Sequence, residues 1–211
     1  MTFQEVLCKF FKFRTDQWRD NLPIRAIHRK DLGSRGDRGR ATLARMMAAL
    51  EFRTGVEVGT KHGASAEMWC EANPQLHLTC VDPYTAYHMV RDQERQESVY
   101  ALATERLKPY NATIVRAFSM DAVKDFEDGS LDFVFIDGNH TFDYVVMDLV
   151  YWAKKVRDGG LILLHDYYNF GQAGVVKAVD AYTHCHRIDP WYITFDETPS
   201  AFWEKGVEKT H

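Results

Sequence analysis

The chain has 211 residues, of which 45% are hydrophobic, and a formal net charge of −4 at pH 7. This length and apolar content suffice for one α/β domain with a short extension. The negative charge, with no lysine or arginine cluster on any expected helix, argues against nucleic acid as the main partner. No apolar run approaches the ~20 residues of a membrane span, and the amino terminus lacks the features of a secretory signal, so we expect a cytoplasmic protein without a membrane partner.

The amino-terminal quarter of the chain differs from the rest. Residues 1 to about 30 are rich in aromatic side chains and indicate helix, residues 31–40 are glycine-rich and basic and indicate a loop, and residues 41–51 predict a helix. We therefore expect residues 1–50 to form a helical extension or cap and residues 51–211 to form the main domain. The aromatic side chains of the extension can pack on their own domain or pair with a second chain. The sequence is therefore compatible with both a monomer and a homo-oligomer.

Strands and helices alternate from residue 54 onward. We expect strands at 54–58, 76–81, 112–117, 131–136 and 161–165, and helices at 64–72, 90–107, 120–126, 141–156 and 172–183. Strands separated by helices predict a parallel, doubly wound sheet. Residues 158–160 are expected to form a turn, and residues 191–195 and 201–204 a terminal hairpin with an antiparallel edge. The expected fold is therefore α/β, with a mostly parallel seven-stranded sheet.

The segment VEVGTKHGAS (residues 56–65) has the pattern of a strand, a glycine turn and a helix start. Gly59 and Gly63 have no Cβ to block a ligand, and Ser65 can cap the helix. The Gly-x-x-x-Gly spacing matches neither a dinucleotide fingerprint nor a Walker loop. A carboxylate at Glu57 repels pyrophosphate but attracts an ammonium or sulfonium group.

Asp82 ends the strand 76–81, where an acid commonly accepts the ribose hydroxyls of a nucleoside. Together with Glu57 it predicts a nucleoside ligand that carries positive charge. The alternative is an ordinary strand-to-helix turn in a doubly wound domain.

A second polar group follows the strands 131–136 and 161–165. Asp137, His165 and Asp166 stand at carboxyl ends, and they converge if these strands are neighbours. Two carboxylates and an imidazole can hold a divalent cation or form a metal-free acid/base set. In the alternative reading, Asp137 caps the next turn, His165 is a buried histidine with its hydrogen bonds satisfied, and Asp166 faces solvent.

Taken in order, these segments resemble class I S-adenosylmethionine-dependent methyltransferases. The resemblance covers about residues 52 to 185 and is carried by EVGxxxGxS (57–65), VDPY (81–84), FIDGNHTF (135–142), Gly159-Gly160 and HDY (165–167). The chain is similar to a subgroup with IDGxHxY and GG…HDY segments, which includes macrocin-type O-methyltransferases and cephalosporin hydroxylase-like proteins. The resemblance implies a Rossmann-like fold and S-adenosylmethionine (SAM) as cofactor.

The resemblance also implies roles for individual residues. Glu57 and Gly59 would face the methionine part of the cofactor, Asp82 the ribose and Ser119 the adenine edge. The rest of the expected cofactor-binding set is Thr60, Gly63, Ser65 and Asp137. In macrocin-type enzymes three carboxylates hold a cation; Asp137, His165 and Asp166 match those positions, with His165 in place of a carboxylate, and the ion would be Mg, Mn or Fe.

The expected catalytic residues are His140, His165 and Asp166. His140 stands three residues after the strand acid, where the similar catechol enzyme has its catalytic lysine, and is the first choice of base. His165 is the second choice. Asn139, at the macrocin-type base position, cannot accept a proton. Alternatively, His140 only positions Asp137.

Three functions follow as hypotheses. The first is O-methylation of a small hydroxylated acceptor, such as a sugar, a polyketide-like molecule or an aromatic compound. The second is a hydroxylase-like relative that uses a redox metal, and the third is a non-catalytic cofactor-binding protein. Five aromatic side chains near the carboxyl edge are candidates for lining an acceptor pocket: Tyr84, Tyr87, Tyr167, Tyr168 and Phe170.

Overall fold

The computed structural model describes residues 2–14, 24–28, 38–86, 92–168, 171, 173–195 and 197–206. Its helices are α1 (Phe3–Phe10), α2 (Arg38–Ala49), α3 (Ala64–Ala72), α4 (Gln93–Leu107), α5 (Ser119–Ala122), η2 (Val123–Asp125), α6 (Phe142–Lys155) and α7 (Val175–Cys185). Its strands are β1 (Phe11–Arg14), β2 (Ile24–His28), β3 (Thr54–Val58), β4 (His77–Val81), β5 (Ala112–Val115), β6 (Leu131–Ile136), β7 (Val156–Leu164), β8 (Tyr192–Thr194) and β9 (Ala201–Glu204). Of the loop expected at 31–40, residues 31–37 lie outside the described residues, and residues 38–40 form the first turn of α2 instead.

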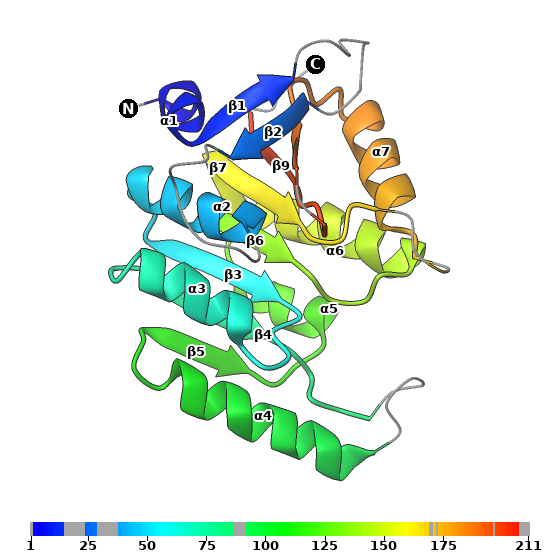
Figure 1. The fold of residues 1–211 in the computed structure, drawn as a ribbon. Helices are drawn as coiled ribbons and strands as arrows, with labels where there is room; N and C mark the ends of the chain where they lie inside the picture. Colours follow the sequence, from blue (N-terminus) through cyan, green and yellow to red (C-terminus); the bar gives the residue numbers. More distant parts are fainter. Residues whose placement is uncertain are drawn as a thin grey trace.

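The strands form one sheet in the order β1-β2-β8-β9-β7-β6-β3-β4-β5. The expected seven-stranded, mostly parallel sheet is confirmed in β3 to β9: β3 to β7 are parallel, and β9 runs antiparallel to both β7 and β8. The arrowheads of the parallel strands point the same way (Figure 1), so their carboxyl ends share one edge of the sheet. Ligands of open α/β sheets bind at that edge.

The described part of the first 30 residues is only partly helical, which corrects the expectation for this segment. After α1, the chain forms β1 and β2, which pair antiparallel and extend the sheet beyond β8. The reason is tertiary: β2 pairs parallel with β8, and Phe11 and Phe13, two residues apart and so on one face of β1, lie near the Phe202 and Tyr192 rings. Local aromatic content does not reveal such pairing.

The expected turn at 158–160 lies inside β7 instead. The pairing of β6 with β7 changes register between Leu131 and Phe133, and Gly159 takes a positive φ of 73° there. Hydrogen bonds of 2.8 Å from Gly159 N to Lys205 O and from Lys205 N to Gly160 O hold this bulged segment in the sheet. The glycines therefore form a bulge and not a chain reversal.

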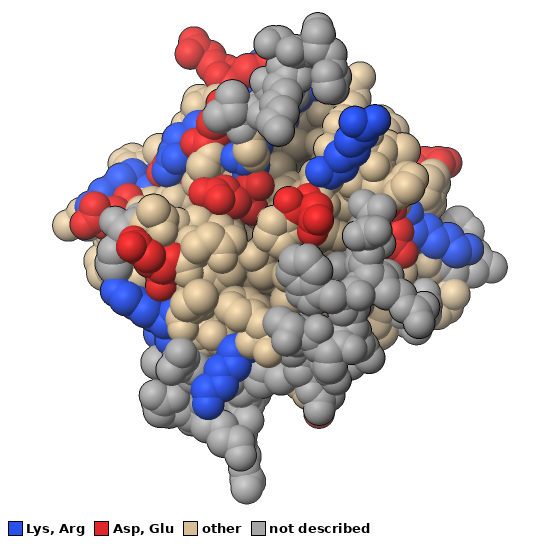
Figure 2. Space-filling model, turned by 90° about the horizontal axis from the view of Figure 1, so that it is seen from above, with Lys and Arg blue, Asp and Glu red and all other residues tan. Residues whose placement is uncertain are grey.

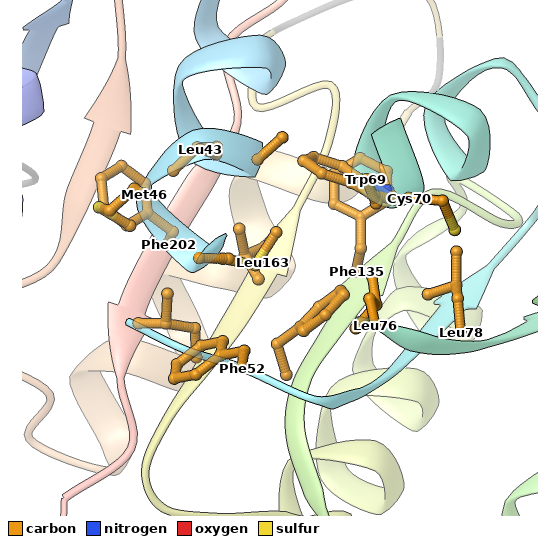
Figure 3. Packing of buried hydrophobic residues seen from close by; sticks show 14 of the residues in the cluster. Leu43, Met46, Phe52, Trp69, Cys70, Leu76, Leu78, Phe135, Leu163 and Phe202 are labelled. Carbon is orange, nitrogen blue, oxygen red and sulfur yellow. The ribbon is translucent and has the colours of Figure 1, made fainter. Parts of the chain in front are cut away.

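Helices cover both faces of the sheet. Buried residues of α1, α2 and α3 pack on one face, and those of α6 and α7 on the other. Figure 3 shows the first cluster, in which Trp69 of α3 meets Phe135 of β6 with ring centroids 5.0 Å apart. This packing fixes α3, and therefore the turn before it, against the strands at the centre of the sheet.

Asp132 joins the amino-terminal ends of three central strands. Its Oδ2 accepts hydrogen bonds from Arg53 N (2.5 Å) and Thr54 N (2.8 Å), and its Oδ1 accepts one from Arg157 Nε (2.7 Å). Burial opposes ionisation, but these donors lower the pKa of Asp132. A lowered pKa means that this stabilisation is present above the unfolded-state pKa and is lost as pH falls through the folded-state pKa.

Replacing Asp132 by alanine is therefore expected to lower the free energy of unfolding by about 2 to 3 kcal/mol at pH 7, since hydrogen bonds to a charged group are lost. Urea unfolding measures the change. Asp128→Ala is the control, because Asp128 is an exposed partner of Lys155 and should change stability by less than about 0.5 kcal/mol. Equal effects for the two variants would contradict the role of Asp132.

None of the helices that the structure describes has the length and apolar character to span a membrane. On the face shown in Figure 2, lysine and arginine side chains of the described residues are interspersed with acidic ones. Those residues form no continuous basic band on that face.

Candidate active site

The carboxyl ends of the central strands are joined in a row by backbone hydrogen bonds. The N–H of Gly59 donates to the end of β4 (2.8 Å), that of Asp137 to the end of β3 (2.8 Å) and that of His165 to the end of β6 (3.0 Å). The two polar segments expected from the sequence are therefore neighbours.

The turn between β3 and α3 depends on its first glycine. Gly59 has φ of +91°, and a Cβ there would lie 2.1 Å from the carbonyl oxygen of Asp137. Gly63, with φ of +75°, occupies the N-cap position of α3 without a side-chain cap. The expected cap at Ser65 is therefore wrong: Ser65 lies in the first turn of α3, and its Oγ accepts a hydrogen bond from Arg40 Nη1 (2.7 Å).

Glu57 is a buried acid with an unused oxygen. Its side chain is 1% exposed, its Oε1 accepts a hydrogen bond from Trp69 Nε1 (3.2 Å), and its Oε2 has no hydrogen-bond partner among the described residues. Burial and the nearby charge of Asp137 raise its pKa to about 8, although Trp69 and Arg40 oppose this. An unpaired buried carboxyl oxygen is costly unless a ligand supplies a donor.

Arg40 was not singled out from the sequence. The structure places it in the first turn of α2, where it donates to Ser65 and its positive charge acts on both Glu57 and His165. The amino-terminal segment thus contributes a cation to this edge of the sheet. No local pattern in the basic segment distinguishes Arg40 from its neighbours.

Asp82 follows β4 and accepts hydrogen bonds from the turn between β3 and α3 and from its own segment. Its Oδ2 accepts a hydrogen bond from Lys61 N (2.9 Å) and its Oδ1 accepts one from Tyr84 N (2.9 Å). Each oxygen keeps a further lone pair for a ligand hydroxyl. Thr60, in the same turn, is buried with 5% exposure.

Asp137, His140 and Asp166 converge after β6 and β7. The Nε2 of His140 lies 3.3 Å from Asp137 Oδ1 and 3.5 Å from Asp166 Oδ2. Ligand atoms of these three residues lie within 4.8 Å of one another, which suits a single metal ion. Burial works against ionisation of Asp137, but hydrogen bonds from His140 and His165 lower its pKa. The group that suits a metal ion thus includes His140, which was expected only as a base, beside Asp137 and Asp166.

His165 is the buried neighbour of this group, with 7% exposure. Its Nδ1 lies 3.0 Å from Asp166 Oδ1 and 3.6 Å from Asp137 Oδ1. Burial alone would lower its pKa, but the two carboxylates raise it to about 9. The raised pKa favours a protonated His165 that pairs with both acids.

Ser119 belongs to a polar cluster with Asp148 and Trp152 of α6. Its hydroxyl is hydrogen-bonded to Asp148 Oδ1 and accepts from Trp152 Nε1 (2.7 Å). Asp148 is 4% exposed, and burial raises its pKa to about 6, although its bond to Ser119 opposes this. Asp148 was not predicted as a functional residue, yet its spacing from Val145 and Trp152 places an acid on the apolar face of the helix.

Three of the five aromatic side chains expected to line an acceptor pocket lie in the part of the chain that the structure describes. Tyr84 is buried and donates to Lys61 O (2.9 Å), and Tyr167 donates to Asp180 Oδ1 (2.7 Å) and packs on Trp191, so both serve the fold. Tyr168 is half-buried beside Asp166, to whose carbonyl its N–H donates. Tyr87 and Phe170 lie outside the described residues.

Comparison with known proteins finds relatives by sequence and several solved structures with a similar fold. An uncharacterized protein of Sinorhizobium fredii is 28% identical over 130 residues, which is 57% of this chain but only 14% of that protein. Among solved structures, the O-methyltransferase TomG from Streptomyces achromogenes, in complex with SAM, has a TM-score of 0.59 at 16% identity, covering 84% of this chain and 83% of its own. An O-methyltransferase from Bacillus cereus in complex with S-adenosylhomocysteine (SAH) has a TM-score of 0.60 at 13% identity, covering 83% and 85%.

A family model described as a methyltransferase domain matches residues 56–167. These residues run from the centre of β3 through the glycine turn, and they include Asp137 and Asp166. This range is more than half of the chain and contains most of the polar groups gathered at the carboxyl edge. The chain therefore belongs to the methyltransferase domain family.

Proposed function

We propose that the protein is a SAM-dependent O-methyltransferase that acts on a small hydroxylated acceptor, such as a sugar, a polyketide-like molecule or an aromatic compound. The observation that carries this proposal is Glu57, whose buried Oε2 faces no donor of the described chain. SAM carries both an ammonium and a sulfonium group, and either is attracted by a carboxylate. The family match and the SAM- and SAH-bound structural neighbours support the same cofactor.

The remaining groups fit the other parts of the cofactor. Asp82 has lone pairs for the ribose hydroxyls, and Ser119 has a hydroxyl for the adenine edge. Backbone groups of Gly59, Thr60 and Gly63 allow close approach of the methionine part, as only a turn without Cβ atoms at the glycines can. Ser65, with Arg40 behind it at 2.7 Å, suits the cofactor's carboxylate.

His140 is the proposed base. Bound SAM supplies the methyl group by direct displacement, in which the acceptor oxygen bonds to the methyl carbon and the sulfonium leaves as a neutral thioether. His140 lies between Asp137 and Asp166, which orient its Nε2–H and stabilise the imidazolium formed when it takes the acceptor's proton. His165 stays protonated and offsets the charge of the two acids.

The same three residues also fit a divalent cation. Asp137, His140 and Asp166 would hold it, and it would lower the pKa of an acceptor hydroxyl. In that case His140 serves as a ligand instead of the base. A set of two carboxylates and one histidine differs from the two-histidine, one-carboxylate set of non-haem iron oxygenases, which disfavours the hydroxylase-like alternative.

Residues 1–50 are proposed as a cap that helps to choose the acceptor. Arg40 supports this role, because it reaches Ser65 from α2.

Calorimetric titration with SAH, in EDTA and then with Mn²⁺ or Mg²⁺, tests the cofactor. One equivalent should bind, and transfer of a tritiated methyl group from SAM to panels of sugars, catechols and polyketide alcohols should identify the acceptor class. Absence of SAH binding under every condition would refute the proposal. Binding without transfer, together with iron-dependent oxidation of the acceptor, would favour the hydroxylase-like function.

The metal site makes its own prediction. Mn²⁺ titrated into EDTA-treated protein should bind at least about tenfold more weakly to His140→Ala than to the wild type, because one of three protein ligands is lost. His62→Ala is the control, since His62 lies in the turn after β3 and outside the three-residue group. Mn²⁺ affinity that is unchanged in His140→Ala, or undetectable in the wild type, would restrict His140 to the role of base.

A further inference from the structure

We propose that Asp148 is a positioning residue that fixes the direction of the Ser119 hydroxyl, so that the site accepts an amino group on the purine ring and rejects a carbonyl oxygen. The inference rests on the proposed function, because it assumes that the purine of the cofactor lies at Ser119. It assigns a role to an acid that lies within the matched family region but stands apart from the polar groups at the strand ends.

The cluster lies beside the expected ligand site. Ser119 begins α5, four residues after the end of β5, and Asp148 lies on α6, which follows β6. A Cβ built on Gly138 would lie 3.7 Å from Asp148 Oδ2, so the carboxylate is close to the residue that follows Asp137. Asp148 is therefore buried between the chain segments that leave β5 and β6 at the ligand-binding edge.

Asp148 and Trp152 determine whether the Ser119 hydroxyl donates or accepts each hydrogen bond. The indole of Trp152 can only donate, and its Nε1 donates to Ser119 Oγ (2.7 Å). An ionised carboxylate can only accept, so the hydrogen of the Ser119 hydroxyl must point to Asp148. Ser119 Oγ then has one lone pair left, which can accept a hydrogen bond but has no hydrogen to donate.

That remaining lone pair suits the 6-amino group of adenine. A purine with a carbonyl oxygen at position 6 would bring two acceptors together, and neither could donate. Sites built around one hydrogen-bond polarity reject the mismatched ligand because buried polar groups are left without partners. Burial raises the pKa of Asp148 to about 6. The carboxylate is therefore mostly ionised at pH 8, and the hydrogen of the Ser119 hydroxyl points to it at that pH.

Burial of Asp148 is also hard to explain by stability. A carboxylate that is 4% exposed on the apolar face of α6, next to Trp152 with 0% exposure, has lost most of its hydration. Burial of a charge costs free energy unless its partners compensate for the lost water. A role in ligand choice accounts for an acid at this position where an apolar residue would pack.

The test compares SAH with S-inosylhomocysteine, which has a carbonyl oxygen in place of the 6-amino group, by calorimetry at pH 8. The wild type should bind SAH at least about tenfold more tightly, a difference of about 1.4 kcal/mol. Asp148→Asn should reduce this ratio to about threefold or less, because the amide can donate to Ser119 and free its hydroxyl hydrogen. Asp143→Asn, an exposed acid on the same helix, is the matched control and should keep the wild-type ratio.

Ser119→Ala is the second variant and keeps the test valid if Asp148→Asn does not fold. It removes the hydroxyl itself and should also abolish most of the discrimination. A merely structural role of Asp148 would weaken both ligands equally and leave their ratio unchanged, and that result overturns the inference. Failure of the wild type to bind SAH at all would overturn the proposed function and this inference with it, so the two failures are distinguishable.

Discussion

Glu57→Gln is expected to weaken SAH binding about 100-fold at pH 8, because removing one partner of a buried charge pair costs 2 kcal/mol or more. Burial and the charge of Asp137 raise the pKa of Glu57 to about 8, so the side chain is mostly neutral in the free protein at pH 6. A cationic ligand favours the ionised form. Binding must therefore release a proton below pH 8.

The pH dependence has a defined sign. In the wild type, SAH affinity should rise up to about tenfold per pH unit from pH 6 and level off near pH 8, whereas Glu57→Gln should bind with nearly the same affinity throughout. Calorimetry in EDTA, in buffers of different ionisation enthalpy, measures both the affinity and the proton release. The ligand control is 5′-methylthioadenosine, which lacks the amino acid part of SAH and should respond little to pH or to the substitution.

The stability of Glu57→Gln provides an internal check. The pKa of Glu57 rises from its ordinary value of 4.5 to about 8 on folding, so its contribution to stability is largest below pH 4.5 and is lost as pH rises through about 8. The glutamine variant should therefore be at least as stable as the wild type at pH 8 in urea unfolding. Weak SAH binding by a stable variant would then reflect the lost charge. Equal loss of 5′-methylthioadenosine binding would instead contradict the placement of Glu57 at the ammonium group.

Gly59→Ala is expected to lower the free energy of unfolding by more than about 4 kcal/mol and to abolish SAH binding. The new Cβ would lie 2.1 Å from the carbonyl oxygen and 2.5 Å from the carbonyl carbon of Asp137, which are backbone atoms that no rotamer change can move. The residue also has φ of +91°, which alanine rarely adopts. The substitution forces β3 and β6 apart at the point where the two halves of the site meet.

Gly129→Ala separates the effect of the positive φ from the effect of the contact between the new Cβ and the backbone. Gly129 also has a positive φ, of 71°, but a Cβ there would approach only Arg157 Cα, at 3.9 Å. Its alanine variant should lose about 1 to 2 kcal/mol, the cost of the left-handed conformation alone. Urea unfolding of both variants gives the comparison. Similar losses at the two positions would show that the contact with Asp137 relaxes easily.

Much of the fold follows from local pattern. The alternation of apolar strands and amphipathic helices from residue 54 onward predicts the parallel sheet, because each element must bury one face or stripe against the next. The glycine turn after Glu57 and the acids Asp82 and Asp137 could be found in the sequence, since carboxyl ends of neighbouring parallel strands share one edge. The segments at 57–65 and 135–142 also carry the family resemblance.

The tertiary structure decided what no local pattern contains. Part of the aromatic segment expected to be helical forms β1 and β2, and β2 pairs with β8. The exposed edge of a sheet supplies hydrogen bonds to such strands, which short-range preferences do not reveal. Packing of α2 brought Arg40 to Ser65, and packing of α6 placed Asp148 against Ser119. Both His140 and His165 lie beside the two acids, and only the tertiary structure shows that His165 is buried and that His140 joins Asp137 and Asp166 in a group that suits a metal ion.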